Sequence, residues 1–221
     1  MNFPFDPETA TAALCRADKR LAGVIERAGP FTMRPEKLRS PFQALLRSIV
    51  YQQLSGKAAA TIYSRVEAAF PGRPGLCPAA ITDAPEELLR GAGMSRAKVA
   101  AVKDLAAKTL DGTVPTLSRL RRMDDEEILT RLVGVRGIGR WTVEMLLIFR
   151  LGRPDVLPVS DLGVRRGFMF TYRKREMPPP GELLRHGERW RPYRSVASWY
   201  LWRAVDLRRR DEEGKRVTPF D

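Results

Sequence analysis

The fold of this chain follows from one stretch of sequence, Leu132-Val133-Gly134-Val135-Arg136-Gly137-Ile138-Gly139-Arg140-Trp141-Thr142. A helical pattern ends before it and another begins after it, so its three glycines mark a tight turn between two helices. The first N–H groups of the second helix lack partners within the helix and carry the positive end of its dipole. Such a turn is suited to binding a backbone phosphate of a nucleic acid. A plain helix–turn–helix corner, with glycine chosen for packing, is the alternative.

Outward from this turn, almost every segment has the apolar spacing of a helix, and no alternating strand pattern is found. We predict an all-α protein of about ten short helices. One helix from Asp6 would carry Leu14, Leu21 and Ile25, the stretch Pro71–Pro78 would form a loop, and the tail Arg208–Glu213 would fray. Other starts are expected at Ser40-Pro41, Ser55, Asp83 to Glu86, Ser95 and Asp124, and later helices at Trp141–Leu151, Asp161–Thr171, Gly181–Glu188 and Pro192–Leu207.

Composition narrows the class of protein. The 221 residues carry a formal charge of +13, with a pI near 10.4, which favours a polyanionic partner; a solubility surplus or an arginine-rich genome is the alternative. No apolar run of about 18 residues predicts a membrane span, and the N-terminus does not resemble a signal peptide. Cys15 and Cys77, with the single His186, cannot alone build a zinc site or an iron–sulfur cluster. We therefore expect a cytoplasmic protein.

Four motifs, in order, resemble those of the helix-hairpin-helix base-excision DNA glycosylase superfamily. The stretch Val135–Thr142 is similar to its hairpin, and Leu157–Arg166 follows where the superfamily carries its catalytic aspartate. Upstream, Ser48–Ser55 resembles the turn that carries the DNA-probing wedge. Downstream, Glu188–Ser195 with Trp202 resembles the alkylation-damage branch, the 3-methyladenine DNA glycosylase II (AlkA-type) enzymes. The resemblance runs from about Pro41 to Trp202.

The resemblance implies two helical subdomains that flank an active-site cleft. Residues 38–150 would form a helical barrel that ends in the helix-hairpin-helix, at about 133–143, and residues 1–37 plus 151–221 would form the subdomain with the catalytic aspartate. Forty residues precede Pro41, too few for the sheet domain of the longer type. Trp141 stands where bifunctional relatives carry a Schiff-base lysine, which argues against lyase chemistry. No cysteine follows Cys77, which argues against an iron–sulfur cluster.

Asp161 is the predicted catalytic residue. It follows the extended segment Pro158-Val159-Ser160 and precedes a helix, so its carboxylate would sit in a cleft. Breaking the bond between a base and deoxyribose builds positive charge on the sugar, which a carboxylate stabilises. The alternative is a helix N-cap, and both roles can hold together.

The remaining candidates come from the resemblance. Trp141 and Trp202 would line the base pocket, although each taken singly would be interpreted as a core residue. Two further pocket positions, which are aromatic in the enterobacterial enzyme, are Met145 and Leu162 in this sequence. Gln53, with Gln52 and Leu54, would be the DNA wedge; the alternative is a helix end that satisfies its own carbonyls. Trp190 and Tyr193 would belong to the pocket wall or to the core, and core is the favoured interpretation. Further phosphate contacts would come from Lys57, Arg165 and Arg166. The hairpin would bind phosphate through Gly137, Gly139, Arg140 and Thr142, and Na⁺ or K⁺ through the backbone carbonyls of Val133, Val135 and Ile138.

The implied function is that of a monofunctional DNA glycosylase. It would flip alkylated bases of the 3-methyladenine and 7-methylguanine type out of double-stranded DNA and hydrolyse their N-glycosidic bonds, leaving an abasic site. We expect a monomer without an organic cofactor. Two rivals remain: a related glycosylase for ethenoadenine, hypoxanthine or mismatched pyrimidines, and a non-catalytic damage-binding protein.

Overall fold

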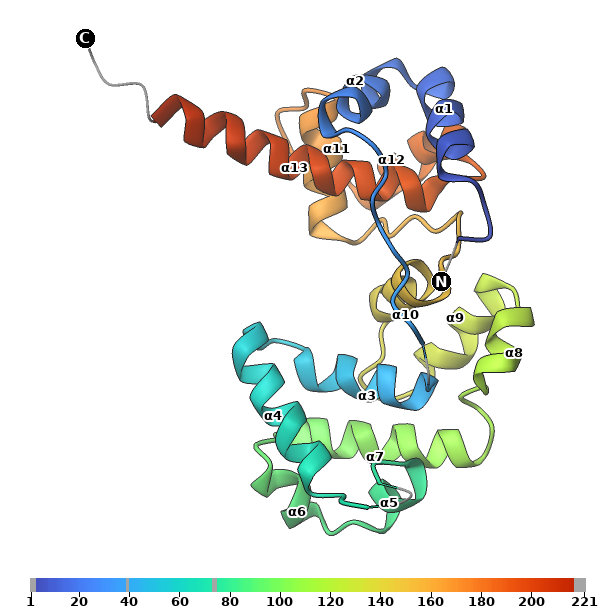
Figure 1. Cartoon of the computed structure of the whole chain (residues 1–221), viewed down its shortest axis with the longest axis vertical. Coiled ribbons are helices and arrows are strands. Elements are labelled where there is room, and N and C mark those ends of the chain that lie inside the picture. Colours follow the sequence, from blue (N-terminus) through green and yellow to red (C-terminus); the bar gives the residue numbers. More distant parts are fainter. Residues whose placement is uncertain (1–2, 39, 73–74, 217–221) are drawn as a thin grey trace. The chain divides into compact units, whose positions relative to one another are not determined.

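The computed structural model describes residues 3–38, 40–72 and 75–216, and within these ranges the regular structure is entirely helical (Figure 1). The predicted all-α class is therefore confirmed. The chain forms two compact units, Lys37–Leu146 and a second unit that joins Met1–Glu36 with Leu147–Asp221. No helix in the described ranges is both long enough and apolar enough to cross a membrane. Cys15 and Cys77 are free thiols.

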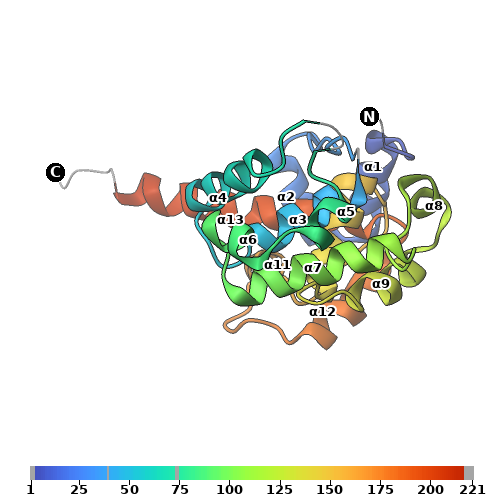
Figure 2. The ribbon, with the colours of Figure 1, turned by 90° about the horizontal axis from the view of Figure 1, so that it is seen from below.

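The unit Lys37–Leu146 is organised around one long helix, α7 (Arg96–Leu110), shown in Figures 1 and 2. Helices α3, α5 and α6 pack against α7, and α4 packs against α3. Fully buried side chains of α3 and α7, such as Leu45, Ile49 and Leu105, form its core. The other helices are α3 (Pro41–Tyr51), α4 (Gly56–Ala68), α5 (Pro78–Asp83), α6 (Glu86–Gly91), α8 (Leu117–Arg122), α9 (Asp125–Val133) and α10 (Arg140–Leu146).

The second unit is built on the pair α11 (Leu162–Thr171) and α13 (Arg194–Arg216). Its core holds Phe168, Tyr200 and Trp190, the last only 1% exposed, so the prediction that Trp190 is a core residue is confirmed. Tyr193 is partly buried and packs on the same core. The other elements are α1 (Pro7–Ala17), α2 (Lys19–Ala28), a π-helical stretch (Leu147–Leu151), α12 (Pro180–Gly187) and a 3₁₀ turn (Glu188–Trp190).

Local sequence sets most helix starts, because Asp and Ser side chains accept hydrogen bonds from the first free N–H groups of a helix. Asp161, for example, accepts from the N–H of Val164 at 2.7 Å. The same capping bond begins α1, α3, α4, α7 and α9, at Asp6, Ser40, Ser55, Ser95 and Asp124.

The prediction of a single N-terminal helix is wrong, because the helix is interrupted at Asp18, between α1 and α2. This side chain is 5% exposed and caps α2 through the N–H groups of Arg20 and Leu21. Its other oxygen accepts hydrogen bonds from three side chains more than 150 residues away, Tyr172, His186 and Trp190. A continuous helix would turn this carboxylate away from these partners.

One further expectation is corrected, and two helices were not expected. The unexpected helices are α5, which begins at Pro78 where the predicted loop Pro71–Pro78 ends, and α8, at Leu117–Arg122. The tail Arg208–Glu213 does not fray but continues α13 to Arg216. Ion pairs support this extension: Arg27 binds Asp211 at 2.9 Å, and Arg208 binds Glu212 one turn along the same helix at 2.8 Å.

Candidate active site

Asp161 begins α11. Its own N–H donates to the Pro158 carbonyl at 3.0 Å, which forms a tight turn, and its Oδ1 accepts the Val164 N–H at 2.7 Å. The N-cap role is therefore confirmed. The residue is half-buried, so the carboxylate is not sealed within the protein. The N-terminal end of α11 also favours a negative charge at this position.

Trp202 holds the carboxylate of Asp161 from α13. Its indole Nε1–H donates to Asp161 Oδ1 at 2.9 Å. The indole is itself stacked on Phe149, with ring centroids 5.5 Å apart and an angle of 26° between the planes. Two donors on one oxygen and a fixed indole ring therefore set the orientation of the carboxylate.

Two glycines of α11 allow α13 to come this close. A Cβ at Gly163 would lie 2.7 Å from Trp202 Cδ1 and 2.9 Å from its Nε1. One turn later, a Cβ at Gly167 would lie 1.9 Å from the carbonyl oxygen of Leu201. The spacing of four residues places both glycines on the face of α11 that α13 crosses. Any larger side chain at residue 163 would push the indole off Asp161.

The predicted hairpin lies between α9 and α10. Val135 and Ile138 point inward, at 1% and 3% exposed, and the Ile138 N–H donates to the Val135 carbonyl at 3.0 Å. Gly137 has a φ of +78°, which requires glycine or strain. A Cβ at Gly139 would meet nothing within 4 Å, so open space lies over the backbone where α10 begins.

Two side chains of helix α7 form hydrogen bonds with the backbone of this hairpin. Asp104 accepts the Arg136 N–H at 2.7 Å, and Lys108 donates to the carbonyl of Gly134. Asp104 and Lys108 also pair with each other, at 2.8 Å. The turn therefore has its polar groups tied to one helix, which keeps its shape fixed.

Not every predicted hairpin contact is equally accessible. Arg140 is engaged by two acids, Glu144 at 2.9 Å and Glu126 at 3.4 Å. Thr142 is buried, whereas Trp141 is 47% exposed. The backbone around Gly137 and Gly139 is thus better placed to meet a phosphate than the side chains of Arg140 and Thr142.

The turn between α3 and α4 carries the predicted wedge. Gln53 has a φ of +58°, a left-handed conformation that is strained for a residue other than glycine, and both Gln53 and Leu54 are exposed. Gln52 behaves differently, because its amide Nε2 donates to the carbonyl of Gly137 at 2.8 Å. The structure thus presents Gln53 and Leu54 to solvent and ties Gln52 to the hairpin.

Several large apolar side chains remain exposed in the structure. Seven such residues occur in the described part of the chain, and four of them are predicted site residues. These four exposed site residues are Leu54, Val133, Trp141 and Leu162, at 39%, 43%, 47% and 59% exposed. Met145, on α10, is a predicted site residue that is half-buried.

The carbonyls of Val133, Val135 and Ile138 are hard, neutral oxygen donors of the kind that Na⁺ or K⁺ accepts. The Val135 carbonyl already accepts the Ile138 N–H, and a carbonyl oxygen has two lone pairs, so it retains capacity for one more bond. Neutral carbonyl oxygens have the donor chemistry that a monovalent cation accepts, and a cation at this turn stays a prediction.

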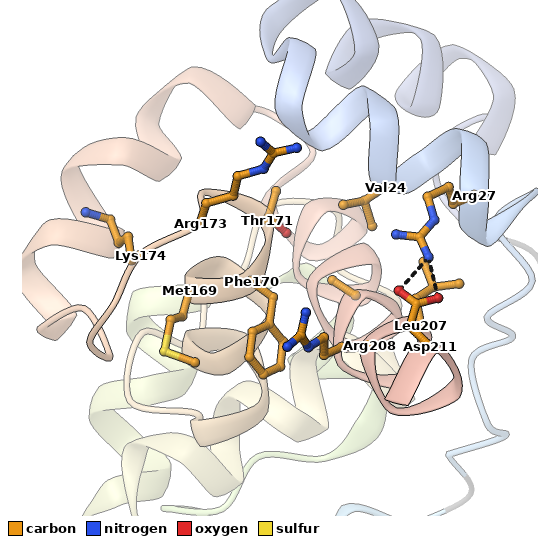
Figure 3. A pocket seen from close by; sticks show the side chains of 11 residues that line it. Val24, Arg27, Met169, Phe170, Thr171, Arg173, Lys174, Leu207, Arg208 and Asp211 are labelled. Atoms are coloured by element: carbon orange, nitrogen blue, oxygen red, sulfur yellow. Dashed lines mark hydrogen bonds and ion pairs between the residues drawn. The ribbon is translucent and has the colours of Figure 1, made fainter. Parts of the chain in front are cut away.

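A cavity of about 390 Å³ lies at the other end of α11, shown in Figure 3. Its lining includes the apolar side chains of Phe170 and Leu207 and four basic side chains. Three of these four already bind carboxylates, so we place the cavity outside the reaction site. The pairs are Arg27 with Asp211, Lys174 with Glu182 and Arg208 with Glu212.

Reasoning from sequence missed the residues that position the site. Gly163 and Gly167 have the four-residue spacing of a close helix crossing, and this signal was present in the sequence. The α7 residues that bond to the hairpin, Asp104 and Lys108, had no such signal, because surface lysines and aspartates are common on any helix.

Comparison with known proteins identifies the family of this chain. The chain is 37% identical over 189 residues to DNA-3-methyladenine glycosylase 1 of Schizosaccharomyces pombe, covering 86% of this chain and 82% of the relative. It superposes on DNA-3-methyladenine glycosidase from Bacillus halodurans with a TM-score of 0.82 and 36% identity, covering 95% of this chain and 94% of the other. The S. pombe enzyme in complex with abasic DNA gives a TM-score of 0.78 and 34% identity, covering 90% of this chain and 97% of the other. Residues 46–192 match the model of a known family. The chain therefore belongs to the HhH-GPD superfamily of base excision DNA repair proteins.

Proposed function

We propose that this protein is a DNA glycosylase that hydrolyses the N-glycosidic bond of alkylated bases, of the 3-methyladenine and 7-methylguanine type, in duplex DNA. The observation that carries the proposal is Asp161, half-buried and oriented through Oδ1 by the N–H groups of Val164 and Trp202. Relatives named as 3-methyladenine glycosylases support the substrate class.

The role of Asp161 follows from the charge of the reaction. As the bond to the base breaks, its electron pair moves to the base nitrogen and positive charge builds on C1′ and the ring oxygen of deoxyribose. A carboxylate already fixed near that carbon stabilises the charge without having to reorganise. Water then adds to C1′ and gives up a proton, which the carboxylate can accept.

Alkylated purines suit a site that has no nearby histidine. Methylation at N3 of adenine or N7 of guanine makes the base cationic, so it leaves as a neutral molecule. No protonation of the leaving group is required. The single histidine of the chain, His186, is engaged by the buried Asp18, which agrees with a mechanism built on one carboxylate.

The other parts of the site bind and open the DNA. We assign phosphate binding chiefly to the backbone at Gly137 and Gly139, with Arg140 and Thr142 as the lesser predicted contacts, and the wedge to Gln53 and Leu54. A monovalent cation held by the carbonyls of Val133, Val135 and Ile138 would supply positive charge near the phosphate. Exposed indole faces attract a cationic purine. Trp141, Met145, Trp202 and Leu162 remain predicted contacts of the flipped base.

We further propose that the enzyme is monofunctional. Lyase activity requires an amine that attacks C1′, and Trp141 offers none. Wild-type product should therefore remain an intact strand until it is treated with alkali, and borohydride should trap no enzyme–DNA adduct. A trapped adduct would contradict this part of the proposal. Because its substrate is cellular DNA, we place the protein in the cytoplasm, at the nucleoid.

Asp161→Asn tests the proposed function. Asparagine keeps an oxygen for the Val164 and Trp202 donors, so the fold should be retained while the charge is removed. Single-turnover release of 3-methyladenine should fall by about 100-fold or more, while affinity for abasic-site duplex stays within about threefold. Near-normal base release by this variant would refute the assignment.

A panel of lesion duplexes separates the rivals. The wild-type protein should act fastest on 3-methyladenine and 7-methylguanine, and more slowly on ethenoadenine, hypoxanthine or a mismatched pyrimidine. Faster release of one of the latter bases would redirect the substrate assignment. A purely damage-binding protein would give no alkali-sensitive sites on any duplex.

A further inference from the structure

We propose that Lys98 and Gln52 are positioning residues that hold the wedge turn, residues 51–55, in a fixed relation to the hairpin, residues 134–139. The inference rests on the proposed function, in which the turn opens the DNA while the hairpin holds its backbone. In this inference the two side chains act on the opening of the duplex and not on the chemistry at Asp161.

Lys98 caps the C-terminal end of α3. Its Nζ donates to the carbonyl of Val50 at 2.6 Å and to that of Gln52 at 2.9 Å. The last carbonyls of a helix lack partners and carry the negative end of its dipole, so an ammonium group is stabilising there. Burial lowers the pKa of the Lys98 ammonium, in agreement with its half-buried place beneath the turn.

The two bonds from Lys98 fix the peptide that precedes the strained residue. Gln52 leaves the helix with an extended backbone, φ −56° and ψ 133°, and Gln53 then takes its positive φ of 58°. A non-glycine residue stays in this conformation only where its neighbours hold it. Lys98 on one side and Ser55, which caps α4, on the other provide that hold.

The side chain of Gln52 extends the connection to the hairpin. Its amide bonds the carbonyl of Gly137 at 2.8 Å. Gly137 in turn packs on α7, where its missing Cβ would lie 3.2 Å from that of Ala101. Lys98, Ala101, Asp104 and Lys108 follow one another at spacings of three, three and four residues, so one face of α7 supports both the turn and the hairpin.

A rigid connection of this kind matters for base flipping. A wedge opens the base stack only if the phosphate contact behind it does not move with the wedge. Without Lys98 or the Gln52 amide, the turn can relax from its strained conformation while the hairpin still binds DNA. The expected defect is therefore in opening the duplex and not in affinity.

Lys103 provides a matched control on the same helix. It is also half-buried, and its Nζ caps the end of α5 through the carbonyls of Ala84 at 2.7 Å and Thr82 at 3.3 Å. It therefore performs the same structural task as Lys98 at a helix end that carries no predicted DNA contact. Lys98→Met and Lys103→Met remove equivalent bonds.

The test compares these variants by two measurements. The first is the fluorescence of 2-aminopurine placed beside a 7-methylguanine in duplex DNA, with Asp161→Asn added to every protein so that no base is released. The second is single-turnover base release with Asp161 intact. Lys98→Met should lose most of the fluorescence rise and slow release about tenfold, with affinity for the duplex within about threefold. Lys103→Met should match the parent protein, and Lys98→Arg should recover most of the loss.

The outcomes separate this inference from the proposed function. A fluorescence rise in Lys98→Met equal to that of Lys103→Met would overturn the inference, and so would a loss of duplex affinity that accounts for the slower release. If Lys98→Met does not fold, Gln52→Met, which removes only the bond to Gly137, is assessed by the same two measurements. Failure of the parent protein to release any alkylated base would instead refute the proposed function.

Discussion

The indole nitrogen of Trp202 lies 2.9 Å from Oδ1 of Asp161, although the two residues are 41 positions apart. A tryptophan predicted to contact the flipped base therefore also orients the predicted catalytic carboxylate. The stacking of Trp202 on Phe149 keeps the donor in place. The same indole thus joins two parts of the proposed site.

Trp202→Phe should slow base release more than it weakens DNA binding. The change removes one hydrogen bond to a charged group, worth about 1.5–3 kcal/mol, which corresponds to roughly a tenfold to hundredfold loss of rate. Trp199→Phe, on the same helix but against Phe31 rather than Asp161, is the control and should keep its rate. Single-turnover rates and duplex affinities measure both effects, and an unchanged rate in Trp202→Phe would show that the bond is not used.

Gly163→Ala should have a similar effect through sterics alone. The new methyl group would lie 2.7 Å from Trp202 Cδ1, so the indole must move away from Asp161. We expect about a tenfold loss of base release and destabilisation of about 1–3 kcal/mol. Gly181→Ala, whose Cβ has its nearest neighbour at 3.7 Å, is the matched control. Normal activity in Gly163→Ala would mean that the crossing of α11 and α13 adapts freely.

Gly139→Ala should weaken DNA binding without disturbing the fold. Its Cβ would meet no protein atom within 4 Å, so only an approaching ligand can meet it. We expect duplex affinity to fall about five- to tenfold as the methyl group blocks a backbone phosphate. Gly23→Ala, on α2 and equally open, should leave affinity unchanged. Fluorescence anisotropy with abasic-site duplex measures this, and equal affinities would argue against phosphate binding at this turn.

Asp18 should make the stability of the protein depend on pH. Burial alone would raise its pKa, but the hydrogen bonds from His186, Tyr172 and the Leu21 N–H outweigh burial and hold the pKa well below its usual range. A group with a pKa lowered by folding contributes stability above the pKa of the unfolded state, and this contribution is lost as the pH falls toward the folded value.

Asp18→Asn should therefore cost about 2 kcal/mol or more of unfolding free energy at pH 7, and less as the pH falls below about 4. Urea unfolding of both proteins from pH 7 to pH 3 measures the difference. Asp83→Asn, at an exposed helix end, is the control. A difference between wild type and Asp18→Asn that stays constant with pH would contradict the proposed electrostatic role of Asp18.

Much of the local structure follows from the sequence, because its causes lie within a few residues. Asp161 caps α11 through Val164, three positions on, and the glycines of 134–139 mark the turn between α9 and α10. The long α13 shows the limit of such reasoning. Its last turns were expected to fray, yet Arg27, 184 positions before its partner Asp211, holds them in place.

The sequence by itself determined most of the helix starts, their caps and the order of the four motifs, since these depend on spacing and on side chains that bond to their own neighbourhood. Only the tertiary structure decided that Trp202 reaches Asp161, that Gln52 bonds Gly137, and that Asp18 divides α1 from α2. Each of these depends on which helices cross and how closely. Two helices approach each other closely where a glycine has no side chain at the crossing, and where buried polar groups form hydrogen bonds with residues distant in sequence.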